Sequence, residues 1–221
     1  MMVKEGHPSY LKRIATDFLR DFAQLLDHVD LDAIERVVER LNAARDTGAM
    51  VYVAGNGGSA ATASHWVNDL GKATKRLGKM PMRAMSLSDN VSWLTALAND
   101  EGYEKVFSGQ LENFAQRGDV LVVISASGNS PNLVRAVEMA RRRGVTTIGF
   151  LGFDGGNLKN MVDEFLWLPT EKGAYGLVES GHALLCHILT TCLMQNQPVT
   201  EVKSTQDAAV GFHGKVLLNG E

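Results

Sequence analysis

Two histidine–carboxylate pairs are the residues of this chain best suited to chemistry. His65 and Asp69 lie four residues apart in a segment with helical periodicity, so their side chains share one helix face. Glu179 and His187 lie eight residues apart in a second helical segment and again share a face. Imidazole and carboxylate groups transfer protons, and both suit Zn²⁺ as ligands. His182 points toward another side of its helix, so we interpret it as a structural residue.

A glycine-rich turn precedes the first of these pairs. The segment Gly55-Asn56-Gly57-Gly58-Ser59 follows an apolar run and opens a helical segment. Free N–H groups and the helix dipole at such a helix start attract an anion, and Ser59 adds a hydroxyl donor. No lysine follows as in a Walker loop, and no acidic residue ends the next strand to hold a dinucleotide ribose. The turn therefore predicts a phosphate site, with a plain tight turn as the alternative.

A second turn rich in hydroxyl groups follows another buried apolar run. It reads Ser125-Ala126-Ser127-Gly128-Asn129-Ser130 and again opens a helical segment. Hydroxyl and amide donors hold a phosphate without a metal, although an ordinary serine-capped helix start is the alternative. Two such turns at the carboxyl ends of two parallel strands predict one crevice at a topological switch point.

The elements that must position these residues alternate along the chain. Short apolar runs alternate with helical periodicity, which predicts a parallel sheet covered by helices on both faces. The expected strands cover residues 49–54, 82–87, 120–125, 145–151 and 164–168. The expected helices within this alternation cover residues 59–76, 90–98, 104–116, 132–143, 157–161 and 176–194.

Two amphipathic helical segments, at residues 10–28 and 32–44, precede this alternation, and Gly48 is expected to end the second. Helical arms of this kind often pack against a partner subunit. We therefore expect residues 1–47 to form a helical arm of the same domain. Residues 48–196 form the α/β body, and residues 197–221 form a tail without clear periodicity.

Composition narrows the class of protein. The 221 residues carry a formal net charge of -3 and are 45% hydrophobic, as in a soluble globular domain. The slight negative charge argues against nonspecific nucleic-acid binding, and Arg141-Arg142-Arg143 is read as a solvated helix end. Cys186 and Cys192 point in different directions on one helix, which fits a reducing compartment. No signal peptide and no apolar run of membrane-span length is visible, so we expect a cytoplasmic protein without membrane contact.

Several ordered motifs together extend over most of the chain. Besides the two turns, they are Ser88-Asp89-Asn90, Ala98-Asn99-Asp100, Gly118-Asp119-Val120-Leu121 and Gly152-Phe153-Asp154-Gly155-Gly156. With these motifs the sequence resembles the sugar isomerase (SIS) domain family, and within it the phosphoheptose isomerases, over about residues 11–196.

This resemblance implies a fold, an activity and an assembly. The fold is a three-layer α-β-α sandwich with a parallel, flavodoxin-like sheet. The activity is aldose–ketose isomerisation of a phosphorylated sugar, sedoheptulose 7-phosphate to a heptose 7-phosphate, in a homotetramer with active sites between subunits. The matching substrate-binding positions are Asn56, Gly57, Gly58, Ser59, Asp89, Asn90, Asn99, Asp100, Ser125, Ser127 and Ser130.

The resemblance also implies catalytic roles. In the family a glutamate is the base and a histidine the acid or base, and some members bind zinc through four side chains. The matching positions here are His65, Asp69, Glu179 and His187, on helices that face each other across the crevice.

The chain departs from this pattern at two positions. Asp69 replaces a glutamate, and Glu179 replaces a glutamine. The loop at residues 172–176 is also about one residue shorter and lacks the usual aspartate. Either the shorter Asp69 has cost the activity, or it serves as a zinc ligand. In the second case Glu179 shuttles the proton and His187 is a ligand or the acid.

Two other functions fit the same resemblance. Relatives of the replication-initiator-associating (DiaA) type keep the tetramer and act through protein contacts, but they lack the histidine that this chain has at His187. A sugar-phosphate-sensing regulator is the third alternative, although no helix-turn-helix segment is visible at the N-terminus.

Overall fold

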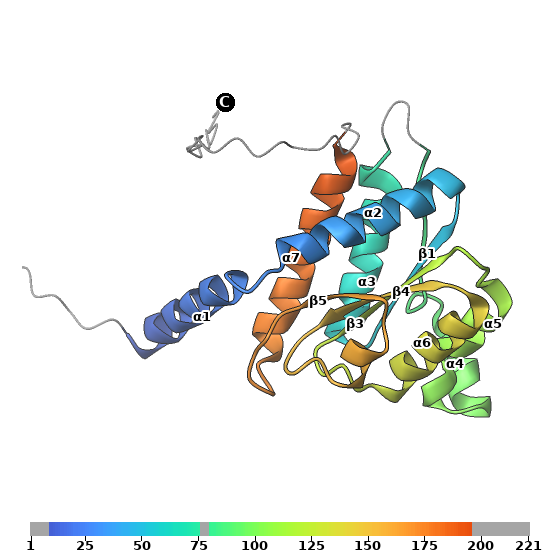
Figure 1. Cartoon of the computed structure of the whole chain (residues 1–221). Helices are drawn as coiled ribbons and strands as arrows, with labels where there is room; N and C mark the ends of the chain where they lie inside the picture. Colours follow the sequence, from blue (N-terminus) through green and yellow to red (C-terminus); the bar gives the residue numbers. More distant parts are fainter. Residues whose placement is uncertain (1–8, 76–79, 196–221) are drawn as a thin grey trace, which may run out of the picture.

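A parallel β-sheet lies at the centre of the molecule (Figure 1), whose computed structural model describes residues 9–75 and 80–195. Within those residues its strands are β1 Met50–Gly55, β2 Arg83–Ser86, β3 Val120–Ser125, β4 Thr146–Leu151 and β5 Glu164–Trp167. All pairings are parallel and the strand order is β2-β1-β3-β4-β5, which is the flavodoxin-like order. The order changes direction between β1 and β3, so a crevice is expected beyond their carboxyl ends.

Helices cover both faces of this sheet. One layer contains α2 Leu31–Thr47, α3 Gly58–Asn68 and α7 Tyr175–Met194, and the other contains α4 Val91–Asp100, α5 Ser108–Phe114 and α6 Pro131–Arg143. Each helical layer forms a hydrophobic core with one face of the sheet. Successive side chains of β3 point to opposite faces, so Val122 packs in the core of the first layer and Val123 in the core of the second. The predicted three-layer sandwich is confirmed.

Helix α1, Tyr10–Leu26, extends away from the body (Figure 1). Its end is anchored, since Leu25 is buried in the core that α7 also lines. The rest of its apolar stripe is exposed, and that stripe consists of Tyr10, Leu11, Ile14, Phe18 and Leu19. The sequence predicted a helical arm over residues 1–47, whereas α2 lies in the layer that covers the sheet. The boundaries at residues 47 and 196 remain predictions, and the tail at 197–221 lies outside the described residues.

Most predicted elements differ from the observed ones by a few residues at their ends, and three differ more clearly. The expected helix at 104–116 is a 3₁₀ turn, Tyr103–Lys105, followed by α5. The expected strand at 82–87 is shorter, and the expected helix at 59–76 becomes a π-helix over Asp69–Ala73. Apolar residues at i, i+3 and i+4 do not distinguish these helix types, because all of them present those positions on one side. Gly48 does end α2, in the left-handed conformation.

Helix α7 is the most apolar long helix of the described residues. Within the described residues it is a helix long and apolar enough to cross a membrane, with a mean hydropathy of 1.3, although no uninterrupted apolar run is present. In the fold it covers the sheet, and 44% of its apolar window is buried.

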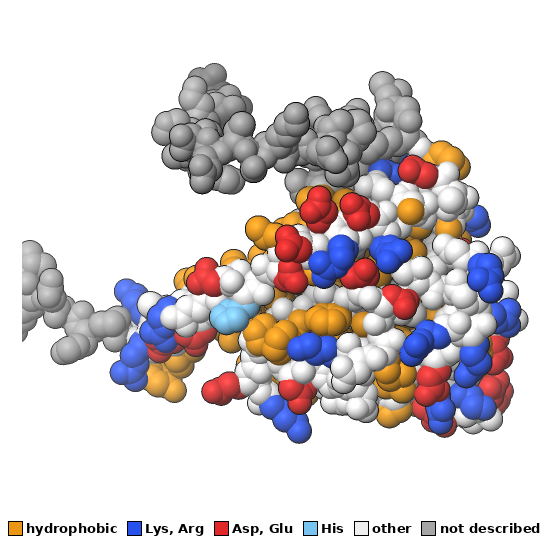
Figure 2. Space-filling model, in the orientation of Figure 1, with side chains coloured by type: hydrophobic (Ala, Val, Ile, Leu, Met, Phe, Trp, Pro, Cys, Tyr) orange, Lys and Arg blue, Asp and Glu red, His pale blue; other side chains and the backbone are white. Residues whose placement is uncertain are grey.

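Charges are interspersed on the molecular surface that Figure 2 shows. Acidic and basic side chains alternate there, and neither sign forms a large continuous patch. The run Arg141–Arg143 lies in the last turn of α6 before Gly144, where cations interact favourably with the helix dipole.

Candidate active site

The two turns predicted to bind phosphate meet in one cleft. The first turn follows β1 and the second follows β3, and these strands are neighbours in the sheet. The cleft has a volume of about 150 Å³ and is lined by Asn56, Ser59, Ile124, Ser125, Ala126, Ser127, Ser130, Tyr175 and Glu179. Five of the predicted substrate-binding side chains therefore surround one space, which we call the serine cleft.

The first turn leaves a helix start open to a ligand. Gly57 is the N-cap of α3, has a φ of 54° and makes no side-chain capping bond. Gly55 allows the tight approach, because a Cβ there would lie 2.6 Å from the backbone of Ser59. The first N–H groups of α3 thus have no side-chain partner, which is the arrangement that binds anions.

The second turn orders its own serines. Ser125 Oγ accepts a hydrogen bond from the Gly128 amide at 3.0 Å, and Ser127 Oγ accepts from the Asn129 amide at 3.3 Å. Ser130 is the N-cap of α6 and makes no side-chain capping bond. Because a hydroxyl can donate while it accepts, Ser125 and Ser127 remain able to donate to a phosphate oxygen.

The glycine motif at residues 152–156 supports the second turn from behind. Gly128 has a φ of 64°, and a Cβ there would overlap the carbonyl oxygen of Gly155. The Leu158 amide donates to the Gly128 carbonyl at 3.0 Å, and the Asn157 amide donates to Asn129 Oδ1 at 2.9 Å. Only glycine allows this close approach of two backbones at position 128.

One aromatic wall of the cleft depends on an unusual backbone. Phe153 has a φ of 43°, which is rare for a residue other than glycine. Its ring packs edge-on against Tyr175 at 5.2 Å between centroids, and its carbonyl accepts from Trp167 Nε1 at 3.1 Å. Tyr175 is the first residue of α7, and its contact with Phe153 places it beside the serine turns.

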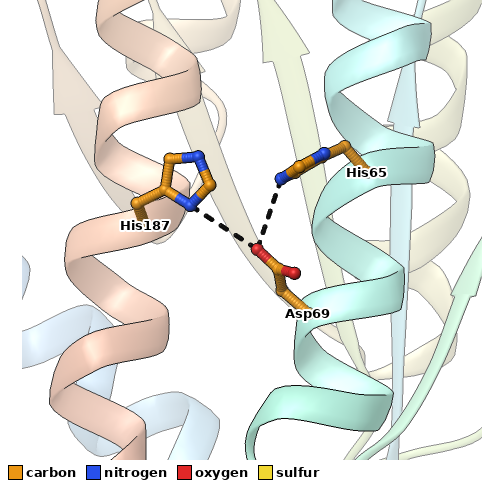
Figure 3. A group of neighbouring side chains, drawn as sticks. All are labelled: His65, Asp69 and His187. Carbon is orange, nitrogen blue, oxygen red and sulfur yellow. Dashed lines mark ion pairs between the residues drawn. The ribbon is translucent and has the colours of Figure 1, made fainter. Parts of the chain in front are cut away.

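A second group of side chains lies between α3 and α7 (Figure 3). His65 Nε2 is 3.4 Å and His187 Nδ1 is 3.6 Å from Asp69 Oδ2, and the imidazole rings are perpendicular with centroids 5.1 Å apart. One donor atom from each residue lies within 4.8 Å of the others. Two imidazoles and a carboxylate fit the three-ligand set of a catalytic zinc ion. We call this group the His–Asp–His cluster.

The helices hold this cluster in place from inside the core. Trp66 and Thr190 are both buried, and Trp66 Nε1 donates to Thr190 Oγ1 at 3.2 Å, which joins α3 to α7. The helix becomes a π-helix at Asp69, and the Thr74 amide donates to the Asp69 carbonyl at 3.3 Å. Such π turns frequently occur at functional sites. The histidines remain more than half exposed, while Asp69 is mostly buried.

Glu179 lies outside this cluster, so the structure brings together three of the four predicted ligands. Its carboxylate lies against Gly58, since a Cβ built there would overlap it, and it lines the serine cleft. The reason is helix rise. Glu179 and His187 share a face of α7, but eight residues separate them by about 12 Å along the axis.

Four other predicted positions do not line the serine cleft. Asp89 accepts a hydrogen bond from Ser64, and Asn90 caps α4 by accepting from the Trp93 amide at 3.1 Å. Asn99 donates to Asp100 at 2.7 Å, and this pair is exposed at the end of α4. Their substrate-binding role remains a prediction.

Sequence reasoning missed three residues of the site. Tyr175 lines the cleft, while Asn132 and Tyr103 both bond to Asn56. The only signal for Asn132 was its place directly after the second serine turn. The contact from Tyr103 joins residues 47 apart in the sequence, which no local pattern reveals.

Two further residues of α7 are structural. His182 is fully buried beside the Phe150 ring, and burial lowers its pKa to about 4, so it is neutral at pH 7. Cys186 is buried near Asp69, and burial together with that carboxylate raises the pKa of its thiol. Cys186 and Cys192 are both free thiols, as predicted.

Comparison with known proteins agrees with this site. Residues 17–152 match the SIS domain family, and the chain belongs to that family. It also resembles the phosphoheptose isomerases within it. It is 37% identical over 188 residues to the phosphoheptose isomerase of Trichlorobacter lovleyi, which covers 85% of this chain and 93% of that protein. It is 36% identical over 176 residues to a probable phosphoheptose isomerase of Thermoplasma acidophilum, covering 79% and 94% of the two chains.

Solved structures show the same likeness. The phosphoheptose isomerase of Neisseria gonorrhoeae superimposes with a TM-score of 0.75 at 30% identity, over 84% of this chain and 98% of that one. The phosphoheptose isomerase of Francisella tularensis superimposes with a TM-score of 0.77 at 27% identity, over 86% and 100%. The likeness therefore extends over almost the whole described fold.

Proposed function

We propose that this protein is an aldose–ketose isomerase that converts sedoheptulose 7-phosphate to a heptose 7-phosphate. The observation that carries the proposal is that the serine cleft and the His–Asp–His cluster lie along the same pair of helices. Ser59 and His65 are six residues apart on α3, which is about 9 Å along its axis. A sugar held by its terminal phosphate in the cleft extends its carbonyl end toward the cluster.

The serine cleft suits a phosphate ester. It offers the uncapped start of α3 and hydroxyl groups from both turns, and among the described residues no lysine or arginine lines it. Hydroxyl and amide donors bind the anion without a fixed countercharge, so the product can leave.

The His–Asp–His cluster suits the carbonyl end of the sugar. His65, Asp69 and His187 would hold a zinc ion, which when bound polarises the substrate's carbonyl or hydroxyl oxygen. The short Asp69 side chain already lies between both imidazoles, so ligation does not need the extra methylene of a glutamate.

Proton transfer between the two carbon atoms requires a base outside that ligand set. Glu179 is the one carboxylate among the residues that line the serine cleft. We assign it the proton shuttle, taking the proton from the carbon beside the carbonyl and returning it to the neighbouring carbon. His187 is a metal ligand, or else the acid that protonates the enediolate oxygen.

We also propose a cytoplasmic homotetramer with active sites built between subunits. The exposed apolar stripe of α1 supports this proposal, because it needs a partner surface to leave water. Light scattering at micromolar concentration should give the mass of four chains. A stable monomer would contradict the proposed assembly.

The test of the activity is incubation of the purified full chain with a panel of ketose phosphates, before and after zinc addition. We expect interconversion of sedoheptulose 7-phosphate, little reaction of unphosphorylated sedoheptulose, and loss of turnover in Glu179→Gln. Metal-free protein that isomerises at full rate would refute the zinc role and favour direct carboxylate–histidine catalysis. Binding without any turnover would favour the DiaA-type alternative.

A further inference from the structure

Two asparagine side chains join the serine turns directly. Asn132 is the second residue of α6 and is 2% exposed. Its Nδ2 donates to Asn56 Oδ1 at 2.8 Å, and its Oδ1 accepts from Asn56 Nδ2 at 3.0 Å. These two bonds form a closed amide ring between residues 76 apart in the sequence. The ring links the first turn to the helix that follows the second.

A third hydrogen bond completes this amide pair. The Tyr103 hydroxyl donates to Asn56 Oδ1 at 3.1 Å, and an amide oxygen has lone pairs for both donors. In this network Asn56 Oδ1 accepts from Asn132 and Tyr103, while Asn56 Nδ2 donates to Asn132. One N–H of Asn56 is not used within this network, and Asn56 lines the serine cleft.

The two helix starts need such a connection. The N-termini of α3 and α6 both lie at the cleft, and neither is neutralised by a side-chain cap. Each carries the positive end of a helix dipole, so the two starts repel each other until an anion lies between them. The neutral amide pair connects them without adding a further charge beside the bound phosphate.

We propose that Asn132 is a positioning residue for the phosphate group of the substrate. It does not line the cleft, and it acts by locking Asn56 and by fixing the separation of the two turns before the ligand arrives. Preorganisation of this kind strengthens binding because less order is lost on association. The inference rests on the proposed function only in taking a phosphate ester as the ligand of the serine cleft.

The test compares single and double variants by calorimetry with two probes, inorganic phosphate and sedoheptulose 7-phosphate. Loss of both amide bonds should weaken binding of each probe about tenfold in Asn132→Ala. The double variant with Asn56→Ala should bind no more weakly than Asn56→Ala alone, because one interaction is removed in both cases. For turnover, KM should rise while kcat changes by less than about threefold. Additive losses, or unchanged phosphate affinity, would overturn the proposal.

Two substitutions at exposed positions test the proposal without altering the buried Asn132. Tyr103→Phe removes a single bond from a residue that is 60% exposed and should weaken phosphate binding about two- to threefold. Asn113→Ala removes an exposed asparagine on α5 whose side chain donates to the Gly109 carbonyl, away from the serine cleft, and it should leave binding unchanged. Equal losses in Tyr103→Phe and Asn113→Ala would contradict the proposal. Phosphate affinity needs no turnover, so this result stands even if no isomerase activity is found.

Discussion

The serine cleft and the His–Asp–His cluster lie on the same pair of helices but are built in different ways. The cleft consists largely of backbone and short side chains fixed by bonds within the turns, such as Ser125 to the Gly128 amide. The cluster consists of side chains that project from two helices, and His65 and His187 are more than half exposed. The phosphate end of the site is therefore preorganised, whereas the chemical end depends on what binds to it.

Replacing one imidazole should distinguish the functions of the cluster and the cleft most clearly. In His65→Ala we expect activity to fall by about 10²–10⁴-fold, because a metal ligand or proton-transfer group is removed. Phosphate affinity should remain unchanged, since the serine cleft contains no part of that side chain. Kinetics and elemental analysis of protein purified without chelator would test this, with near-stoichiometric zinc expected in the wild type and none in the variant. Full activity in His65→Ala would remove the cluster from the mechanism.

The opposite result is expected when the support of the cleft is changed. Gly128→Ala places a Cβ against the Gly155 carbonyl at a positive φ, which costs roughly 1–3 kcal/mol before the steric overlap is counted. Phosphate binding should weaken by more than about tenfold, while zinc content stays at the wild-type level. Gly71→Ala is a matched control, because a Cβ there meets no atom within 4 Å. Equal phosphate affinity in both variants would show that the turn tolerates movement.

Acid should destabilise the fold through the buried His182 of α7. Burial holds the pKa of His182 at about 4, below its ordinary value of 6.5, so the unfolded chain binds more protons between those values. The free energy of unfolding should therefore rise with pH across that window and fall as the pH drops from about 6.5 to 4. Denaturant titrations at several pH values would measure the slope. His182→Leu should reduce that slope.

The smallest effect is expected for single hydroxyl groups of the cleft. Ser59→Ala or Ser127→Ala removes one hydrogen bond, typically worth about 0.5–1.5 kcal/mol, from a site with several other donors. Affinity for sedoheptulose 7-phosphate should fall by about two- to tenfold with little change in kcat. Calorimetry would measure this affinity. If neither variant weakens binding, the phosphate is not held in the serine cleft.

The sequence by itself determined most of the architecture of this protein. Buried runs such as residues 120–125 match their strand without error, because a strand covered on both faces must be continuously apolar. The two turns were predictable because glycine and serine at a strand-to-helix junction have few other uses. The i, i+4 spacing also placed His65 and Asp69 together, since both lie on one helix.

Only the tertiary structure decided how these parts meet. It brought His187 of α7 next to Asp69. It placed Glu179 against Gly58 instead, because two residues on one helix face point in the same direction but can lie far apart along the helix axis. It also revealed the bond between Asn56 and Asn132, which no spacing indicates. Local patterns record which way a side chain points within its own element. Contacts between residues far apart in the sequence depend on how helices pack against the sheet, and that packing is a property of the whole chain.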